Sequence, residues 1–160
     1  MKSKLTFHSV LPALLAWAGL SLMLHLGWEV IQMPLYTLWK EDDALHIAWS
    51  ITHCTAGDVL IACATFTLAS LCLRRVDWPI QAPWRGLAIL LTSGVAYTVF
   101  SEWRNVYRLG SWSYTDAMPT LWGIGLAPIT QWLLVPILTL WMFKRVRSSS
   151  RPNRRGLDGP

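Results

Sequence analysis

Four long apolar segments are the feature that most restricts how this chain can fold. They cover residues 10–35, 46–73, 85–107 and 121–143. Each is long enough to cross a hydrocarbon core of about 30 Å, which requires about 20 helical residues. An α-helix satisfies all its backbone polar groups within one segment, as lipid demands. The sequence therefore predicts an all-α, polytopic membrane protein whose four transmembrane helices form one bundle, a single domain over residues 1–147.

Composition supports a membrane protein. Hydrophobic residues make up 53% of the 160 residues, charged residues only 14%, and there are 11 tryptophans. A soluble domain carries about 25% charged residues, and tryptophan is enriched at membrane–water interfaces. The formal net charge is +5, but the basic residues lie at the ends of the apolar segments rather than in a patch. We therefore expect no nucleic-acid partner.

The basic residues also predict the orientation. Eleven of the 14 lysines and arginines lie on one side, in the N-terminus, the second connection and the C-terminal tail. Positive residues stay cytoplasmic, so we predict that both termini are cytoplasmic and that the protein resides in a bacterial-type inner membrane. Residues 148–160 form a polar, basic tail that we expect to be disordered and attracted to anionic lipid headgroups.

The first apolar segment contains an unusual polar stripe. His25, Glu29 and Gln32 follow at steps of four and three residues, which places their side chains on one helical face. Ionisable groups are expensive in hydrocarbon, so they usually have partners and functions. In the second segment His46 and His53 share a stripe, while Asp58 points towards a different neighbour, the third or fourth helix.

Together the four segments predict a polar pocket in the outer half of the bilayer. The candidate catalytic residues are His25, Glu29, His53, Asp58 and Glu102. The candidate substrate-binding residues are Trp28, Gln32, Trp49, Asn105, Trp112 and Gln131.

This pocket indicates an acid–base enzyme of the isomerase or cyclase type, acting on a lipophilic isoprenoid or lipid-like molecule. A carboxylic acid against hydrocarbon tends to keep its proton, so Glu29 or Glu102 is the candidate acid. A histidine or the other carboxylate would accept a proton. Tryptophan ring faces would stabilise a cationic intermediate. This interpretation requires no cofactor.

One short element carries a family resemblance. Gly27-Trp28-Glu29-Val30 resembles the Trp-Glu element of integral-membrane terpene cyclases of the fungal meroterpenoid type. The resemblance covers four residues, and that family has more membrane spans than this chain. It implies that Glu29 is the acid.

Three alternatives remain open at this point. His25 and Glu29 at i and i+4, completed by His53, would suit zinc or iron, although no compact motif such as His-Glu-x-x-His is present. The polar groups would also suit ion or proton transport, or a small subunit of a larger membrane complex. Finally, Arg104 and Arg108 would neutralise Glu29 and Glu102 in an interfacial collar of ion pairs.

The longest connection, residues 108–120, contains glycine, serine, aromatic and proline residues. We interpret it as an aromatic anchor at the membrane interface. The alternative is a lid that folds back over the end of the bundle.

Overall fold

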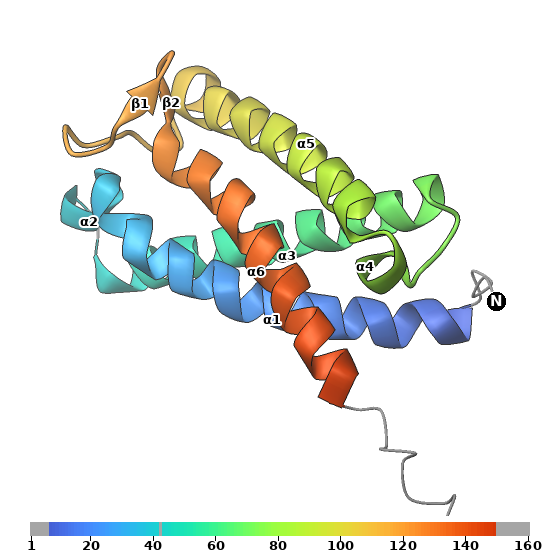
Figure 1. Cartoon of the computed structure of the whole chain (residues 1–160). Helices are drawn as coiled ribbons and strands as arrows, with labels where there is room; N and C mark the ends of the chain where they lie inside the picture. Colours follow the sequence, from blue (N-terminus) through green and yellow to red (C-terminus); the bar gives the residue numbers. More distant parts are fainter. Residues whose placement is uncertain (1–6, 42, 150–160) are drawn as a thin grey trace, which may run out of the picture.

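The computed structural model describes residues 7–41 and 43–149, so the predictions for the basic tail concern residues mostly outside the described part. The described chain is mostly helical. Four long helices cross one another in antiparallel succession (Figure 1): α1 (Phe7–Gln32), α3 (Ala44–Cys72), α5 (Pro83–Glu102) and α6 (Leu126–Ser149). The shorter elements are the 3-10 turn Met33–Leu35, α2 (Leu38–Glu41), α4 (Trp78–Gln81), a π-helical segment (Trp103–Leu109), β1 (Thr120–Leu121) and β2 (Ile124–Gly125).

Three of the described helices are long and apolar enough to cross a membrane. They are Val10–Leu35, Ala44–Cys72 and Leu126–Ser148. The structure therefore bears out a helical chain with membrane-spanning capacity and suggests a membrane protein. Helix α5 packs against both α3 and α6, and α1 packs against the same two helices.

Local sequence signals explain where the helices begin. Asp43 caps α3, because its Oδ1 accepts a hydrogen bond of 2.8 Å from the backbone N–H of His46; such caps satisfy an otherwise free N–H group. Helix α6 begins at Leu126 rather than at residue 121 as predicted. The intervening residues form the antiparallel β1–β2 hairpin. Trp122 and Gly123 make its turn, and their positive φ angles of 51° and 82° are incompatible with an α-helix that begins at residue 121.

An aromatic core fills the end of the bundle near α4. The rings of Trp17, Phe66 and Trp78 are buried, with centroids 5.2–5.6 Å apart, and Phe143 lies 5.8 Å from Trp17. Such tilted contacts are favourable for aromatic pairs. The polar side chains of the cavity lie at the opposite end of the bundle, the hairpin end, which carries α2 and the β1–β2 hairpin (Figure 1).

The connection from Gly110 to Pro119 folds back over the hairpin end, as the lid interpretation anticipated. The N–H of Thr37 donates to the carbonyl of Ser113 at 3.0 Å, and the N–H of Thr115 donates to that of Leu35 at 2.9 Å. An isolated antiparallel bridge joins Tyr36 to Tyr114. The connection is therefore held against the chain that follows α1.

Gly94 allows α5 and α6 to approach closely. A Cβ atom at this position would overlap the ring of Trp132, which is 2% exposed. The absence of a side chain at Gly94 therefore decides how the two helices pack.

We predict that Gly94→Ala lowers the free energy of unfolding by about 1–3 kcal/mol, the usual cost of overpacking. Gly19→Ala is the matched control, because Gly19 is exposed and a Cβ there meets nothing within 4 Å. Tryptophan fluorescence during unfolding in mild detergent measures both. Equal stability of the two variants would contradict the described packing.

Candidate functional site

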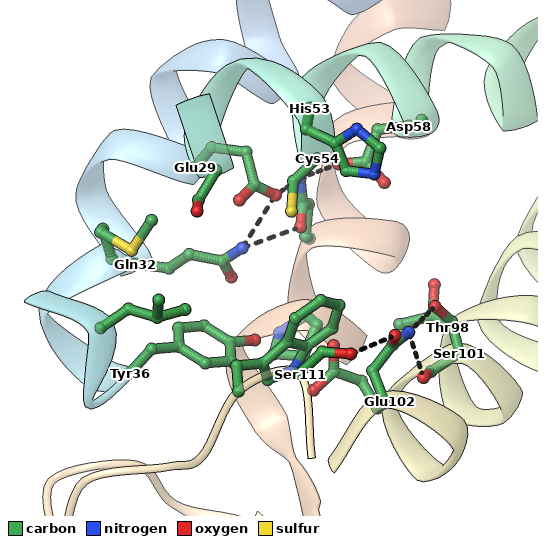
Figure 2. A pocket seen from close by; sticks show the side chains of 18 of the residues that line it. Glu29, Gln32, Tyr36, His53, Cys54, Asp58, Thr98, Ser101, Glu102 and Ser111 are labelled. Carbon is green, nitrogen blue, oxygen red and sulfur yellow. Dashed lines mark hydrogen bonds between the residues drawn. The ribbon is translucent and has the colours of Figure 1, made fainter. Parts of the chain in front are cut away.

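A cavity of about 470 Å³ lies among α1, α3, α5 and α6 at the hairpin end (Figure 2). Helix α3 lines it with residues spaced three or four apart, which lie on one helical face: His46, Ser50, His53 and Gly57. A Cβ at Gly57 would meet nothing within 4 Å, so this glycine borders open space. Cys54, Tyr97, Ser101, Arg104, Asn105, Trp112 and Trp132 also line the cavity.

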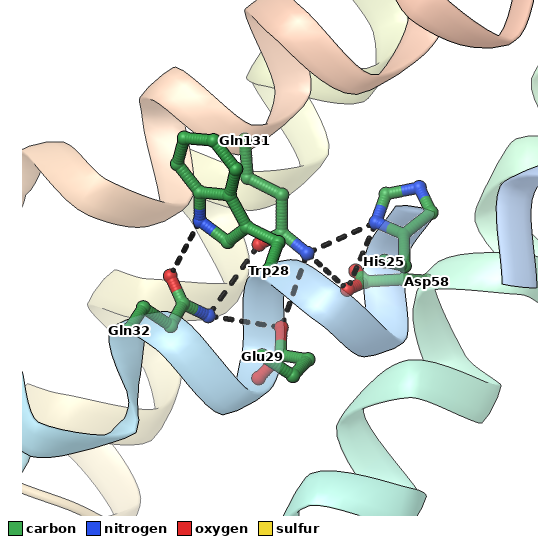
Figure 3. A network of polar contacts seen from close by, with 6 residues as sticks. All are labelled: His25, Trp28, Glu29, Gln32, Asp58 and Gln131. Carbon is green, nitrogen blue, oxygen red and sulfur yellow. Dashed lines mark hydrogen bonds and ion pairs between the residues drawn. The ribbon is translucent and has the colours of Figure 1, made fainter. Parts of the chain in front are cut away.

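One wall of the cavity is a polar network centred on Gln131 (Figure 3). The Gln131 amide nitrogen lies 2.9 Å from His25 Nδ1, 3.1 Å from Glu29 Oε1 and 2.9 Å from Asp58 Oδ2. Gln32 Nε2 donates to Glu29 Oε1 at 2.9 Å and lies 3.5 Å from the Gln131 carbonyl oxygen. The network thus joins α1, α3 and α6 through one side chain.

The hydrogens available restrict how this network is arranged. Gln131 Nε2 has two hydrogens and three neighbours that could accept them. His25 Nδ1 is also 3.3 Å from Asp58 Oδ2. When His25 Nδ1 is unprotonated it accepts one of the two hydrogens, and when it carries a hydrogen it donates to Asp58 and Gln131 donates to the carboxyl groups. The tautomer of His25 therefore decides how the two hydrogens of Gln131 are used.

Glu29 and Asp58 lie close enough to interact directly as two carboxyl groups. Glu29 is 6% exposed and its carboxyl borders the cavity. Two carboxylates that share one buried site do not both ionise readily, because their charges repel. Glu29 Oε1 and Asp58 Oδ2 lie 3.1 Å and 2.9 Å from the same Gln131 nitrogen, so the two carboxyl groups are neighbours at the cavity wall.

Glu102 occupies the opposite wall (Figure 2). It is 6% exposed, and its Oε2 accepts a hydrogen bond of 2.6 Å from the Tyr114 hydroxyl. The Tyr114 oxygen accepts in turn from the Gly125 N–H at 3.0 Å. Burial, together with the hydrogen bond to Glu102, raises the pKa of the Tyr114 phenol well above its usual value, so this residue remains a donor at physiological pH.

The structure brings most predicted site residues to this cavity, though in different roles. Glu29, Gln32, Trp49, His53, Asp58, Glu102, Asn105, Trp112 and Gln131 line it. His25 and Trp28 instead support the wall from behind: His25 contacts Asp58, and the Trp28 indole N–H donates to Gln32 Oε1 at 3.0 Å. Asp58 contacts α6 through Gln131, as expected, and also α1.

The proposed collar of ion pairs is not found in the described part of the chain. Arg108 lies 5.7 Å from the centroid of the Trp103 ring. Arg104 borders the cavity, and no ion pair joins either arginine to Glu29 or Glu102 among the described residues. Within residues 7–41 and 43–149, no group of three or more His, Cys, Asp or Glu side chains is placed to hold a metal ion.

Sequence reasoning missed Tyr36 and Tyr114. Tyr36 follows the 3-10 turn Met33–Leu35 and has an extended backbone, so helical spacing from Gln32 does not place it. Tyr114 lies in a connection without periodicity, and only the fold brings it to Glu102. Cys54 and Gly57, which border the cavity on α3, carried no signal beyond their spacing from His53.

The fold and the cavity define a class: a helical chain with membrane-spanning capacity and an internal site of carboxyl, amide, imidazole and aromatic groups. Comparison with protein-family models, curated proteins and solved structures finds no match for this chain.

We predict that Gln131→Leu lowers the free energy of unfolding by about 2–4 kcal/mol, because it removes the donor that Glu29 and Asp58 share at the junction of three helices. Gln81→Leu is the control: Gln81 is exposed, and surface substitutions usually change stability by less than about 0.5 kcal/mol. Denaturant unfolding in detergent compares them. A stable Gln131→Leu protein would show that the network does not hold the helices together.

Tyr114→Phe removes both hydrogen bonds of the Tyr114 hydroxyl, and we expect a loss of about 1–3 kcal/mol. Because folding raises the Tyr114 pKa, this contribution persists below the ordinary phenol pKa of about 10 and disappears only as the pH rises through the raised value. The measurement is the stability difference between wild type and variant as a function of pH. Tyr97→Phe, which alters a half-exposed hydroxyl, should have little effect; a loss equal to that of Tyr114→Phe would refute the assignment.

Proposed function

We propose that this protein is a membrane-embedded acid–base enzyme that moves protons on a lipophilic isoprenoid or lipid-like substrate, as an isomerase or cyclase. The observation that carries the proposal is the placement of Glu29 and Asp58. These carboxyl groups come from different helices, contact the same amide nitrogen and border a cavity large enough for an organic ligand.

In the proposed reaction, protonated Glu29 gives its proton to one carbon of an alkene. A new C–H bond forms, the π bond breaks, and a positive charge remains on the neighbouring carbon. Loss of a proton from an adjacent carbon to the Glu29–Asp58 pair then forms a new double bond and restores the pair. The net result is a shifted double bond, or a new ring where a second alkene attacks the cation first.

The surrounding residues support these roles. Gln32 and Gln131 both donate to Glu29 Oε1, so neither of these hydrogen bonds uses the second carboxyl oxygen. His25 contacts Asp58 and can stabilise its charge when the proton is on Glu29. The likeness of Gly27–Val30 to the Trp-Glu element of membrane terpene cyclases also favours Glu29 as the acid.

The lining beyond the carboxyl groups suits a lipophilic molecule. Trp49 and Tyr97, which are 64% and 49% exposed, border the cavity together with Ile61 and Trp132. Binding sites for organic ligands typically combine apolar and aromatic walls with a few oriented polar groups.

We also propose that α5 is a fourth membrane-crossing helix in a bacterial-type inner membrane, with both termini cytoplasmic. Two features favour this arrangement. Helix α5 is 20 residues long and runs antiparallel to the helices before and after it (Figure 1). The basic residues also follow the positive-inside rule under this topology.

The reaction is tested by deuterium transfer. We expect purified wild-type protein in deuterated water to introduce deuterium into linear prenyl alcohols or prenyl lipids, detected by mass spectrometry. Glu29→Gln should reduce the rate about 100-fold or more, as loss of a general acid does. Asp116→Asn, an exposed carboxyl outside this cavity, should retain the rate. Deuterium incorporation by Glu29→Gln at the wild-type rate would exclude Glu29 as the acid. If the wild-type protein incorporates no deuterium into any of these prenyl alcohols and prenyl lipids, this substrate class is excluded.

The topology is tested with reporters fused after Arg75, after Gly110 and at the C-terminus. We expect the first and third to be cytoplasmic and the second to be external. An external signal from the Arg75 or C-terminal fusion would contradict the proposed orientation.

A further inference from the structure

Glu102 is a buried carboxyl group without a basic partner in the described chain. Its Oε2 accepts a hydrogen bond of 2.6 Å from the Tyr114 hydroxyl, and a carboxyl group has acceptor capacity for further donors. Among residues 7–41 and 43–149, no lysine, arginine or histidine forms an ion pair with it. A buried carboxylate is normally paired, and the cavity beside Glu102 offers room for a cationic partner that the described residues do not supply.

Aromatic side chains surround this carboxylate. Tyr36 lies edge-on to Trp112, with ring centroids 6.4 Å apart, and its ring is 5.7 Å from that of Tyr114. Tyr36 and Trp112 also lie close enough to Glu102 to act on its charge. Aromatic ring faces attract a cation within about 6 Å. We name Glu102, Tyr36, Trp112 and Tyr114 the Glu102 corner.

The side chains that contact the Glu29 carboxyl group differ in kind from those around Glu102. Two amide groups direct N–H donors at Glu29 and Asp58, and the imidazole of His25 lies beside Asp58. The side chains that act on Glu102 are instead the aromatic residues Tyr114, Trp112 and Tyr36, whose rings can also attract a cation. Figure 2 shows the two walls facing each other across the cavity.

We infer that the Glu102 corner binds the ammonium group of a lipophilic amine, whose apolar part occupies the cavity beside Trp49 and Tyr97. The inference rests on the proposed function in one respect: an ammonium group imitates the positive charge that forms when an alkene is protonated from Glu29. The cavity would then hold protonated amines more tightly than neutral molecules of the same shape.

Three compact probes with one hydrocarbon skeleton test this directly: 1-adamantylamine, 1-adamantanol and 1-adamantanecarboxylate. Isothermal titration calorimetry in a neutral detergent, with protein-free micelles as the blank, gives the three affinities. We expect the amine to bind about tenfold or more tightly than the alcohol, in keeping with a desolvated cation–aromatic and ionic contact. Glu102→Gln should abolish this preference, whereas Asp116→Asn, which changes an exposed carboxyl group outside the cavity, should retain it.

A second variant keeps the test decisive if Glu102→Gln does not fold. Trp112→Leu should weaken the amine by about threefold or more and leave the alcohol unchanged. Equal affinities for amine and alcohol in wild type would overturn the inference. So would a preference for the carboxylate, which would point to Arg104 instead, or a preference for the amine that survives in both variants.

Binding and turnover are separate readouts. Amine preference at Glu102 without any deuterium transfer would support this inference and refute the proposed reaction. Deuterium transfer without amine preference would support the reaction and refute this inference.

Discussion

The amide group of Gln131 is the interaction on which the site depends. It contacts His25 and Glu29 on α1 and Asp58 on α3 from its own position on α6. In water such contacts are worth little, but among apolar helices an unsatisfied carboxyl or imidazole is costly. The same network therefore fixes how three helices meet and keeps two carboxyl groups together. The two hydrogens of the Gln131 amide nitrogen face three possible acceptors. Their distribution affects both the packing of the helices and the proposed acid–base chemistry.

The rest of the fold separates apolar packing from this polar group. Trp17, Phe66 and Trp78 fill the α4 end with a buried aromatic core. Gly94 brings Trp132 against α5, beside the cavity wall. At the hairpin end the connection from Gly110 onward is tied to the chain after α1, and Tyr114 extends it to Glu102. At this end the cavity is therefore bordered by chain segments whose backbones are hydrogen-bonded to each other.

The sequence predicts the helices and much of the candidate site, for a physical reason. Helical spacing alone puts Glu29 and Gln32 on one face, and the expense of ionisable groups in lipid makes that face point inward. Asp58 was expected to face the third or fourth helix; it contacts Gln131 on α6 and also His25 on α1. Spacing does not say which neighbour lies opposite, so the contact of Asp58 with His25 could not be foreseen.

Trp28 was expected to line the pocket. Its indole N–H instead donates to Gln32 Oε1, and the ring lies behind the cavity wall. The start of α6 was misplaced, since two positive φ angles at Trp122 and Gly123 leave no mark on hydropathy. Tyr114 was missed because long-range closure, not periodicity, brings it to Glu102.

The central claim is that Glu29 and Asp58 share one proton at neutral pH, and infrared spectroscopy tests it most directly. A protonated carboxyl group has a C=O stretch that is distinct from the carboxylate bands and shifts in deuterated water. The account predicts that wild-type protein at neutral pH shows this band for one buried acid, and that the band is lost in Glu29→Gln and in Asp58→Asn but persists in Glu102→Gln. A spectrum without a protonated carboxyl band, or with a band unchanged in both Glu29→Gln and Asp58→Asn, would contradict it.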